Sequence, residues 1–74
     1  MRSTVVKRSV EVGGRRTSIS LEDAFWTSVK EIAASREKTY SGLISEIDQH
    51  RQSPNLSSAI RLFVLQYYQE RARS

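Results

Sequence analysis

The stretch 15–21 alternates polar and apolar residues and leads directly into a segment with a different apolar spacing. Strict alternation is typical of a half-buried β-strand, whereas apolar residues three and four positions apart are typical of an amphipathic helix. One face of the expected strand carries Thr17, Ile19 and Leu21. The other face carries Arg16, Ser18 and Ser20. The pattern therefore predicts a strand over about 15–21 that runs straight into a helix.

Three helices are expected after this strand, over about 22–36, 40–50 and 56–70. The first has an apolar stripe made of Phe25, Val29, Ile32 and Ala33, with Trp26 beside it as a core or interface residue. Its acidic start at Glu22 and Asp23 suits the positive end of a helix dipole, and either Ser20 or Leu21 is the expected cap.

The second helix is expected after the hydroxyl cap Thr39, and the third after Asn55. Leu43, Ile44 and Ile47 form the apolar side of the second helix. The third helix carries a stripe made of Leu56, Ala59, Ile60, Phe63, Val64 and Tyr67. Leu62, Leu65 and Tyr68 widen that stripe beyond one face. A helix this apolar in a small chain is expected to be buried between subunits.

The segment 1–14 before the strand has two interpretations. Val6, Val10 and Val12 favour a further strand over about 5–12, and Gly13-Gly14 is typical of a two-residue hairpin turn. The alternation is imperfect, so a flexible basic arm is the alternative. The main strand needs a partner for its backbone groups, and a second copy of the same strand would supply one.

The composition limits the protein to one small domain. The chain has 74 residues, no Cys and one His, so neither disulfides nor a structural zinc site can stabilise it. Oligomerisation is the remaining common route. The longest apolar run, residues 62–65, is far too short to span a membrane, and the N-terminus has no signal-peptide pattern. A cytoplasmic protein that does not contact membranes is expected.

The positive charge is concentrated at the start of the chain. Residues 1–16 hold five basic residues and one acidic residue, a net charge of +4, whereas the basic and acidic residues of 17–74 cancel. A basic segment of this kind indicates a polyanion partner such as nucleic acid, although a solvated tail would have the same composition. Lys7, Arg8 and Arg15 are the candidate phosphate contacts of this segment.

The order strand, helix, short turn and helix over residues 16–47 resembles the ribbon-helix-helix DNA-binding proteins, of which the Arc and methionine repressors are the best-known members. The resemblance is closest in residues 15–26, 44–48 and 55–61, which look like a group of small bacterial proteins of this fold. It implies a mainly α fold with a short β-ribbon, in which two chains pair their strands and insert them into the DNA major groove. The third helix and the N-terminal segment lie outside the family's minimal unit.

The resemblance also implies roles for individual residues. Arg16, Ser18 and Ser20 on the outward strand face would contact bases, and Thr39, Tyr40 and Ser41 at the start of the second helix would hold a phosphate. A free helix N-terminus suits an anion on physical grounds as well. The expected function is a homodimeric, sequence-specific binder of double-stranded DNA that represses transcription.

An enzyme is not expected. Asp48 and His50 are two positions apart on a helix and do not share a face, and no Cys can act as a nucleophile. No cofactor, metal ion or small-molecule ligand is indicated. The alternative to a DNA-binding protein is a protein-interaction module, antitoxin-like or a dimeric adaptor, that uses the apolar third helix.

Overall fold

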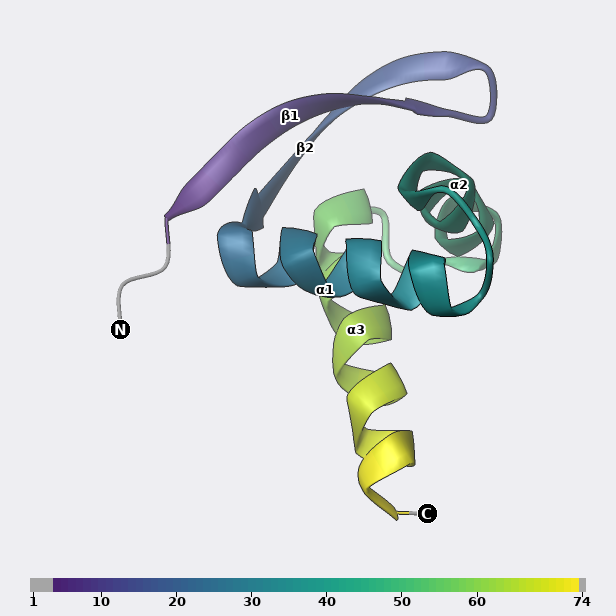
Figure 1. Cartoon of the computed structure of the whole chain (residues 1–74). Helices are drawn as coiled ribbons and strands as arrows, with labels where there is room; N and C mark the ends of the chain where they lie inside the picture. Colours follow the sequence, from purple (N-terminus) through teal and green to yellow (C-terminus); the bar gives the residue numbers. More distant parts are fainter. Residues whose placement is uncertain (1–3, 74) are drawn as a thin grey trace.

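A β-hairpin and three helices make up residues 4–73, the part of the chain that the computed structural model describes. The elements are β1 (Val5–Val12), β2 (Arg15–Glu22), α1 (Asp23–Ser35), α2 (Tyr40–His50) and α3 (Leu56–Arg73). The hairpin arches over the helices, and the C-terminal half of α3 extends away from them (Figure 1). Arg2, counted above in the basic segment, lies outside the described residues.

The hairpin confirms the strand interpretation of the N-terminal segment, so β2 finds its first partner within its own chain. The strands β1 and β2 pair antiparallel, with Val12 opposite Arg15 and Val5 opposite Glu22. Gly13 and Gly14 connect them with φ of +59° and +81°. A two-residue turn with both φ values positive matches the right-handed twist of the strands, and glycine adopts it without strain.

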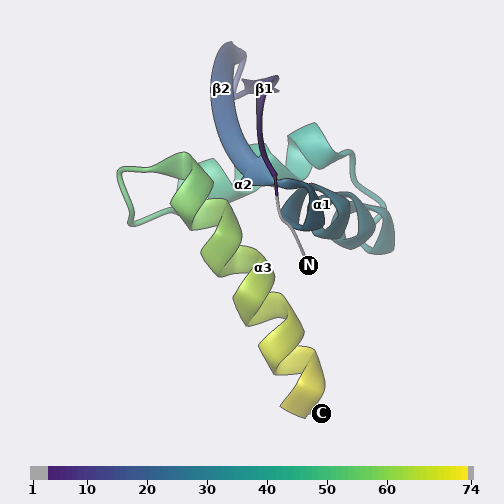
Figure 2. The same cartoon turned by 90° about the vertical axis from the view of Figure 1, so that its left-hand side faces the viewer.

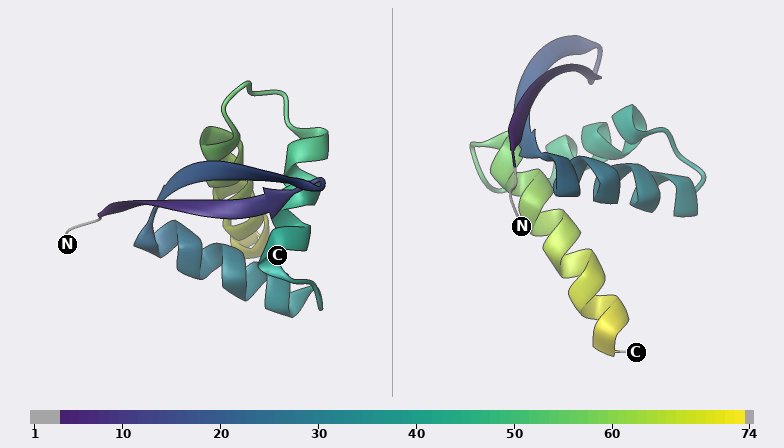
Figure 3. Two further views of the ribbon diagram at one scale, coloured as in Figure 1. Left: turned by 90° about the horizontal axis from the view of Figure 1, so that it is seen from above. Right: turned by 60° about the vertical axis from the view of Figure 1, so that its left-hand side comes forward.

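The core lies between the inner face of the hairpin and the three helices. Seen from above, the hairpin lies across the helices (Figure 3). The hairpin contributes Val10, Val12, Ile19 and Leu21. Buried helix residues are Trp26, Val29, Ile32 and Ala33 of α1, Leu43, Ile44 and Ile47 of α2, and Ala59, Ile60 and Val64 of α3. The predicted inward face of β2 and the predicted apolar sides of α1 and α2 are therefore largely confirmed.

The first helix differs from the expectation in its cap and in the burial of Phe25, whereas Trp26 lies in the core as expected. The N-cap is Glu22, whose side chain makes no capping bond, because β2 continues through the expected cap positions Ser20 and Leu21. Trp26 is 3% exposed, whereas Phe25 is only partly buried. The helix follows β2 without a linker, and this connection turns Trp26 toward the core.

The caps of the other two helices are confirmed. The Thr39 hydroxyl accepts a hydrogen bond from the Gly42 N–H at 3.0 Å, and the Asn55 side-chain oxygen accepts one from the Ser58 N–H at 3.1 Å. The third helix continues to Arg73, three residues beyond its expected end. Within residues 4–73, none of the helices has the length and apolar character needed to cross a lipid bilayer.

The hairpin turn gives a direct test of the fold. Gly14→Val should destabilise the protein by about 1–2 kcal/mol, because a side chain with a Cβ is strained at positive φ. Gly14→Asn is the matched control, since asparagine tolerates this conformation, and it should cost much less. Urea denaturation of the two variants measures the difference. Equal stability of the valine and asparagine variants would contradict the turn geometry.

Candidate nucleic-acid interface

The outer face of the hairpin is polar along its whole length. It combines Lys7, Ser9 and Glu11 of β1 with Arg16, Ser18 and Ser20 of β2. The register places Lys7 opposite Ser20, Ser9 opposite Ser18 and Glu11 opposite Arg16. Only Ser20 of this set is partly buried, and the others are exposed. The structure thus places the three predicted base-contacting residues on the same face as Lys7, which was predicted to contact phosphate.

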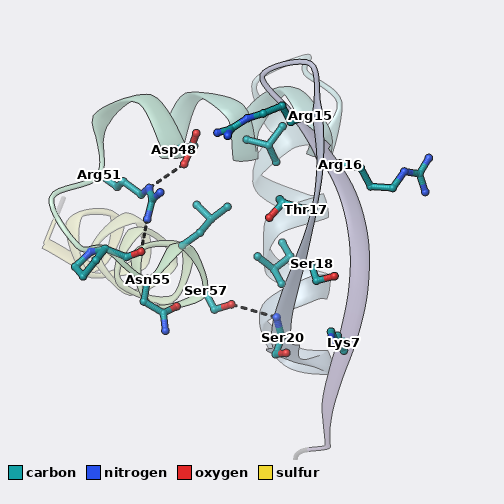
Figure 4. A pocket seen from close by; sticks show the side chains of 14 residues that line it. Lys7, Arg15, Arg16, Thr17, Ser18, Ser20, Asp48, Arg51, Asn55 and Ser57 are labelled. Carbon is teal, nitrogen blue, oxygen red and sulfur yellow. Dashed lines mark hydrogen bonds and ion pairs between the residues drawn. The ribbon is translucent and has the colours of Figure 1, made fainter.

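Arg15 and Arg16 lie next to each other in sequence but project to opposite sides of the hairpin. Arg16 points away from the body of the protein, and Arg15 points toward α2, as Figure 4 shows. Glu11 faces Arg16 across the strands, and no ion pair joins the two side chains within the described residues. The Arg16 side chain is therefore exposed and is not held by Glu11.

Arg8 is placed differently from the other predicted phosphate contacts. It shares the inner face of β1 with Val10, and its guanidinium stacks over the Trp26 ring at 4.9 Å from the centroid. It also lies 3.9 Å from the Asp23 carboxylate. A guanidinium over an indole face is stabilised by the ring quadrupole. Arg8 therefore packs half-exposed against Trp26, at the edge of the candidate nucleic-acid interface.

The N-terminus of α2, with Thr39, Tyr40 and Ser41, lies beside β1 and the hairpin turn. The Ser41 hydroxyl donates to the Glu11 carbonyl at 2.6 Å, and the Gly13 N–H donates to the Ser45 hydroxyl at 3.3 Å. No acceptor within residues 4–73 receives the N–H groups of Tyr40 and Ser41. Two free amides at the positive end of a helix are suited to an anion.

The hydrogen bonds of Ser20 run to α3, on the edge of β2 opposite β1. Its N–H donates to the Ser57 hydroxyl at 3.1 Å, and its carbonyl accepts from Arg61 at 3.0 Å. Arg61 also donates to the Glu22 carboxylate at 2.9 Å and holds the pKa of Glu22 below its ordinary value of 4.5. These contacts fix the end of the hairpin on α3.

A groove of about 580 Å³ runs along the remaining part of this edge, between β2 and the loop that joins α2 to α3 (Figure 4). Arg15 and Thr17 line its strand side, and Asn55 lines its loop side. Arg51 pairs with Asp48 at 2.8 Å and donates to the Pro54 carbonyl at 2.6 Å. Arg51 therefore holds the loop in place.

Sequence reasoning missed Ser9 and Glu11 on the outer face and the role of Arg61. The first two could have been found, because a two-residue turn at Gly13-Gly14 fixes the register of the hairpin and hence the residues opposite Ser18 and Arg16. No pattern in the sequence around Arg61 indicated its role. Its contacts with Ser20 and Glu22 join residues about forty positions apart.

The fold agrees with the comparisons with known proteins. The model of the ribbon-helix-helix domain matches residues 5–68, so this chain belongs to the ribbon-helix-helix family. Members of this family are typically DNA-binding regulators of transcription, and the family is not an enzymatic one. No protein in the curated set matches the chain.

A solved structure similar to this chain is that of an uncharacterized protein from Bordetella pertussis Tohama I. The two are 29% identical, with a TM-score of 0.80 over 95% of this chain and 60% of that protein. This chain therefore spans about 60% of the length of its structural neighbour. The likeness includes the hairpin and α3, since it extends over almost the whole chain.

The contact between Glu22 and Arg61 predicts a pH dependence of stability. Because folding lowers the pKa of Glu22, its contribution is present above pH 4.5 and is lost as the pH falls through the folded value. Glu22→Gln should therefore be less stable than the parent at neutral pH, and the difference should shrink below pH 4.5. Denaturation curves at a series of pH values measure it. Arg61→Ala should converge only in part, because it also loses the bond to the Ser20 carbonyl, which is present at every pH. A gap between Glu22→Gln and the parent that is independent of pH would contradict the assignment.

Proposed function

We propose that this chain is a sequence-specific DNA-binding protein that works as a homodimer, inserts its hairpin into the major groove and represses transcription. The observation that carries the proposal is the polar outer face of the hairpin, whose inner face is anchored on the helices. A two-stranded ribbon fits the major groove of B-DNA. Anchoring the inner face leaves the outer side chains free to contact DNA.

Base readout in this proposal comes from Arg16, Ser18 and Ser20. An arginine can donate two hydrogen bonds to the O6 and N7 atoms of a guanine, which is the commonest specific contact. Serine both donates and accepts, so Ser18 and Ser20 discriminate less strongly between bases. The exposure of Arg16 and its direction away from the protein support this assignment.

Phosphate contacts in this proposal come from two places. The first is the start of α2, where the free amides of Tyr40 and Ser41 and the cap Thr39 would hold a phosphate of the DNA backbone. The second is the basic hairpin, with Lys7 on the outer face and Arg8 and Arg15 on the other. Their positive charge supports binding to any DNA sequence and makes it sensitive to salt.

The proposal is tested by selecting bound sequences from a random pool of duplexes and measuring affinity for the selected site by gel shift. A recurrent sequence that binds at least about 1,000-fold more tightly than random DNA is expected for a specific regulator. If no duplex shifts even at low salt, the protein-interaction alternative gains support. The exposed apolar side chains of α3 are the feature that favours that alternative.

Arg16 and Arg15 form a matched pair of substitutions for base readout. Arg16→Ala should lose about 1–3 kcal/mol of binding per half-site on the selected sequence and much less on random DNA. Arg15→Ala removes the same charge from the opposite side of the hairpin, and should weaken binding to both DNAs about equally. Salt titrations by fluorescence anisotropy measure both effects. Equal losses on both DNAs for Arg16→Ala would make Arg16 a backbone contact.

Thr39 tests the phosphate site at the start of α2. Thr39→Asp and Thr39→Asn both keep a good N-cap, so both variants should be about as stable as the parent. Only the aspartate places a negative charge beside the expected phosphate. Thr39→Asp should therefore bind DNA at least about tenfold more weakly than Thr39→Asn at low salt, and the gap should narrow as salt rises. Equal affinity of the two variants would show that no phosphate docks there.

A further inference from the structure

One carboxylate stands on the face of the hairpin that otherwise carries basic and hydroxyl side chains. Glu11 of β1 shares this outer face with Lys7 and Arg16. It is exposed, and it makes no ion pair within residues 4–73. In Figure 2 the hairpin rises above the helices while α3 runs away from it. Because DNA phosphates repel a carboxylate, Glu11 can favour DNA binding only through a bond of its own to a base.

The backbone at Glu11 is fixed relative to the start of α2. The Ser41 hydroxyl donates to the Glu11 carbonyl at 2.6 Å, and the Gly13 N–H donates to the Ser45 hydroxyl at 3.3 Å. Ser41 also carries one of the two free amides to which a DNA phosphate is assigned above. Phosphate contacts set the register of a protein on DNA. A phosphate bound at Ser41 would therefore hold the Glu11 side chain at a defined place over the base edges.

Glu11 lies directly opposite Arg16 in the hairpin. The backbone groups of Ser20 bond to α3, and Arg16 lies four positions before Ser20, so Arg16 and Glu11 form a pair without hydrogen bonds between their backbones. The Cβ atoms of such a pair are about 4.5–5.5 Å apart. Neighbouring base pairs are about 3.4 Å apart along the axis of B-DNA. Since an arginine fork covers the edge of one base pair, Glu11 would reach the next one.

We propose that Glu11 recognises a cytosine in the base pair next to the guanine that Arg16 contacts. A carboxylate only accepts hydrogen bonds. In the major groove cytosine presents its N4 amino donor alone, whereas guanine and thymine present acceptors that repel a carboxylate. Adenine presents a donor at N6 but an acceptor beside it at N7. The inference rests on the DNA binding proposed above and adds a residue of β1 to the base contacts, which were assigned there to β2 alone.

The negative charge of Glu11 makes it a residue of specificity rather than of affinity. The carboxylate lies near phosphates on every DNA sequence and weakens all binding to the same extent. Its bond to cytosine offsets this repulsion only on a site that has the cytosine. Discrimination between partners commonly combines a repulsive element with an attractive one in this way. The exposed Lys7 on the same strand has the opposite effect, since its charge favours every sequence.

Glu11→Gln tests the inference, because glutamine has the same shape but bonds to the N6 and N7 atoms of adenine. Bound duplexes are selected from a random pool with the parent and with the variant. The parent should select a cytosine next to the guanine that Arg16→Ala no longer selects, and Glu11→Gln should select adenine at that position. Gel shifts on two duplexes that differ only in this base pair should show a preference of at least about fivefold, in opposite directions for the two proteins.

Two further variants separate base recognition from charge. Glu11→Ala should lose the preference at this position without gaining another, and both Glu11 variants should bind random DNA about twofold to fivefold more tightly than the parent at low salt. Glu70→Gln is the matched control, because it removes the same charge from the half of α3 that extends away from the hairpin. It should keep the base preference of the parent. Circular dichroism melting should show all three variants as stable as the parent.

Failure of this inference differs from failure of the proposed function. If the parent selects a site and Glu11→Gln selects the same bases at every position, Glu11 does not contact a base, while specific DNA binding still stands. If the only change is a weaker preference for the guanine of Arg16, Glu11 acts on that arginine and not on a cytosine, which also overturns the inference. A parent that selects no sequence at all would overturn both.

Discussion

The antiparallel pairing of β1 with β2 inside one chain is the interaction on which the other contacts depend. It satisfies one edge of β2 and brings Val10 and Val12 onto the same face as Ile19, so the hairpin has a continuous apolar underside. The start of α2 is tied to this hairpin through Ser41 and Ser45, which bond to the backbone at Glu11 and Gly13. Without β1 these bonds have no partner, and the candidate anion site loses its place beside the ribbon.

The third helix covers one end of the second edge of β2, at Ser20. Ser57 and Arg61 bond to the N–H and the carbonyl of Ser20, and Arg61 is itself held by Glu22. A free strand edge is a template for unwanted pairing, and a covered edge is protected. The added helix therefore stabilises the ribbon end where the chain turns into α1.

Local patterns were sufficient to predict most of the fold. The alternation in β2, the spacing in the helices and the caps at Thr39 and Asn55 depend on neighbouring residues, and they are confirmed apart from the burial of Phe25. The turn at Gly13-Gly14 left two alternatives, because a sequence with imperfect alternation does not reveal whether its strand is paired.

The predictions that failed concerned residues whose positions depend on contacts with residues far away in the sequence. Phe25 was expected in the core but is only partly buried, whereas Trp26 lies in the core as expected. Arg8 stacks over the Trp26 ring instead of lying on the outer face. The residues of the candidate site also separate into those that the local pattern identifies and those that it does not. Arg16, Ser18 and Ser20 were placed correctly on the outer face by parity alone, whereas Ser9 and Glu11 required the register of the hairpin.

The in-chain hairpin also gives the ribbon a direction. A ribbon built from two identical strands looks the same from both ends, so the sequence it contacts is its own inverted repeat. Here the strands differ: Lys7, Ser9 and Glu11 face Ser20, Ser18 and Arg16, with charge of opposite sign at the two ends of β1. In the DNA binding proposed above, one hairpin would therefore distinguish the two orientations of a DNA site, and any inverted repeat would arise from the spacing of two hairpins rather than within one.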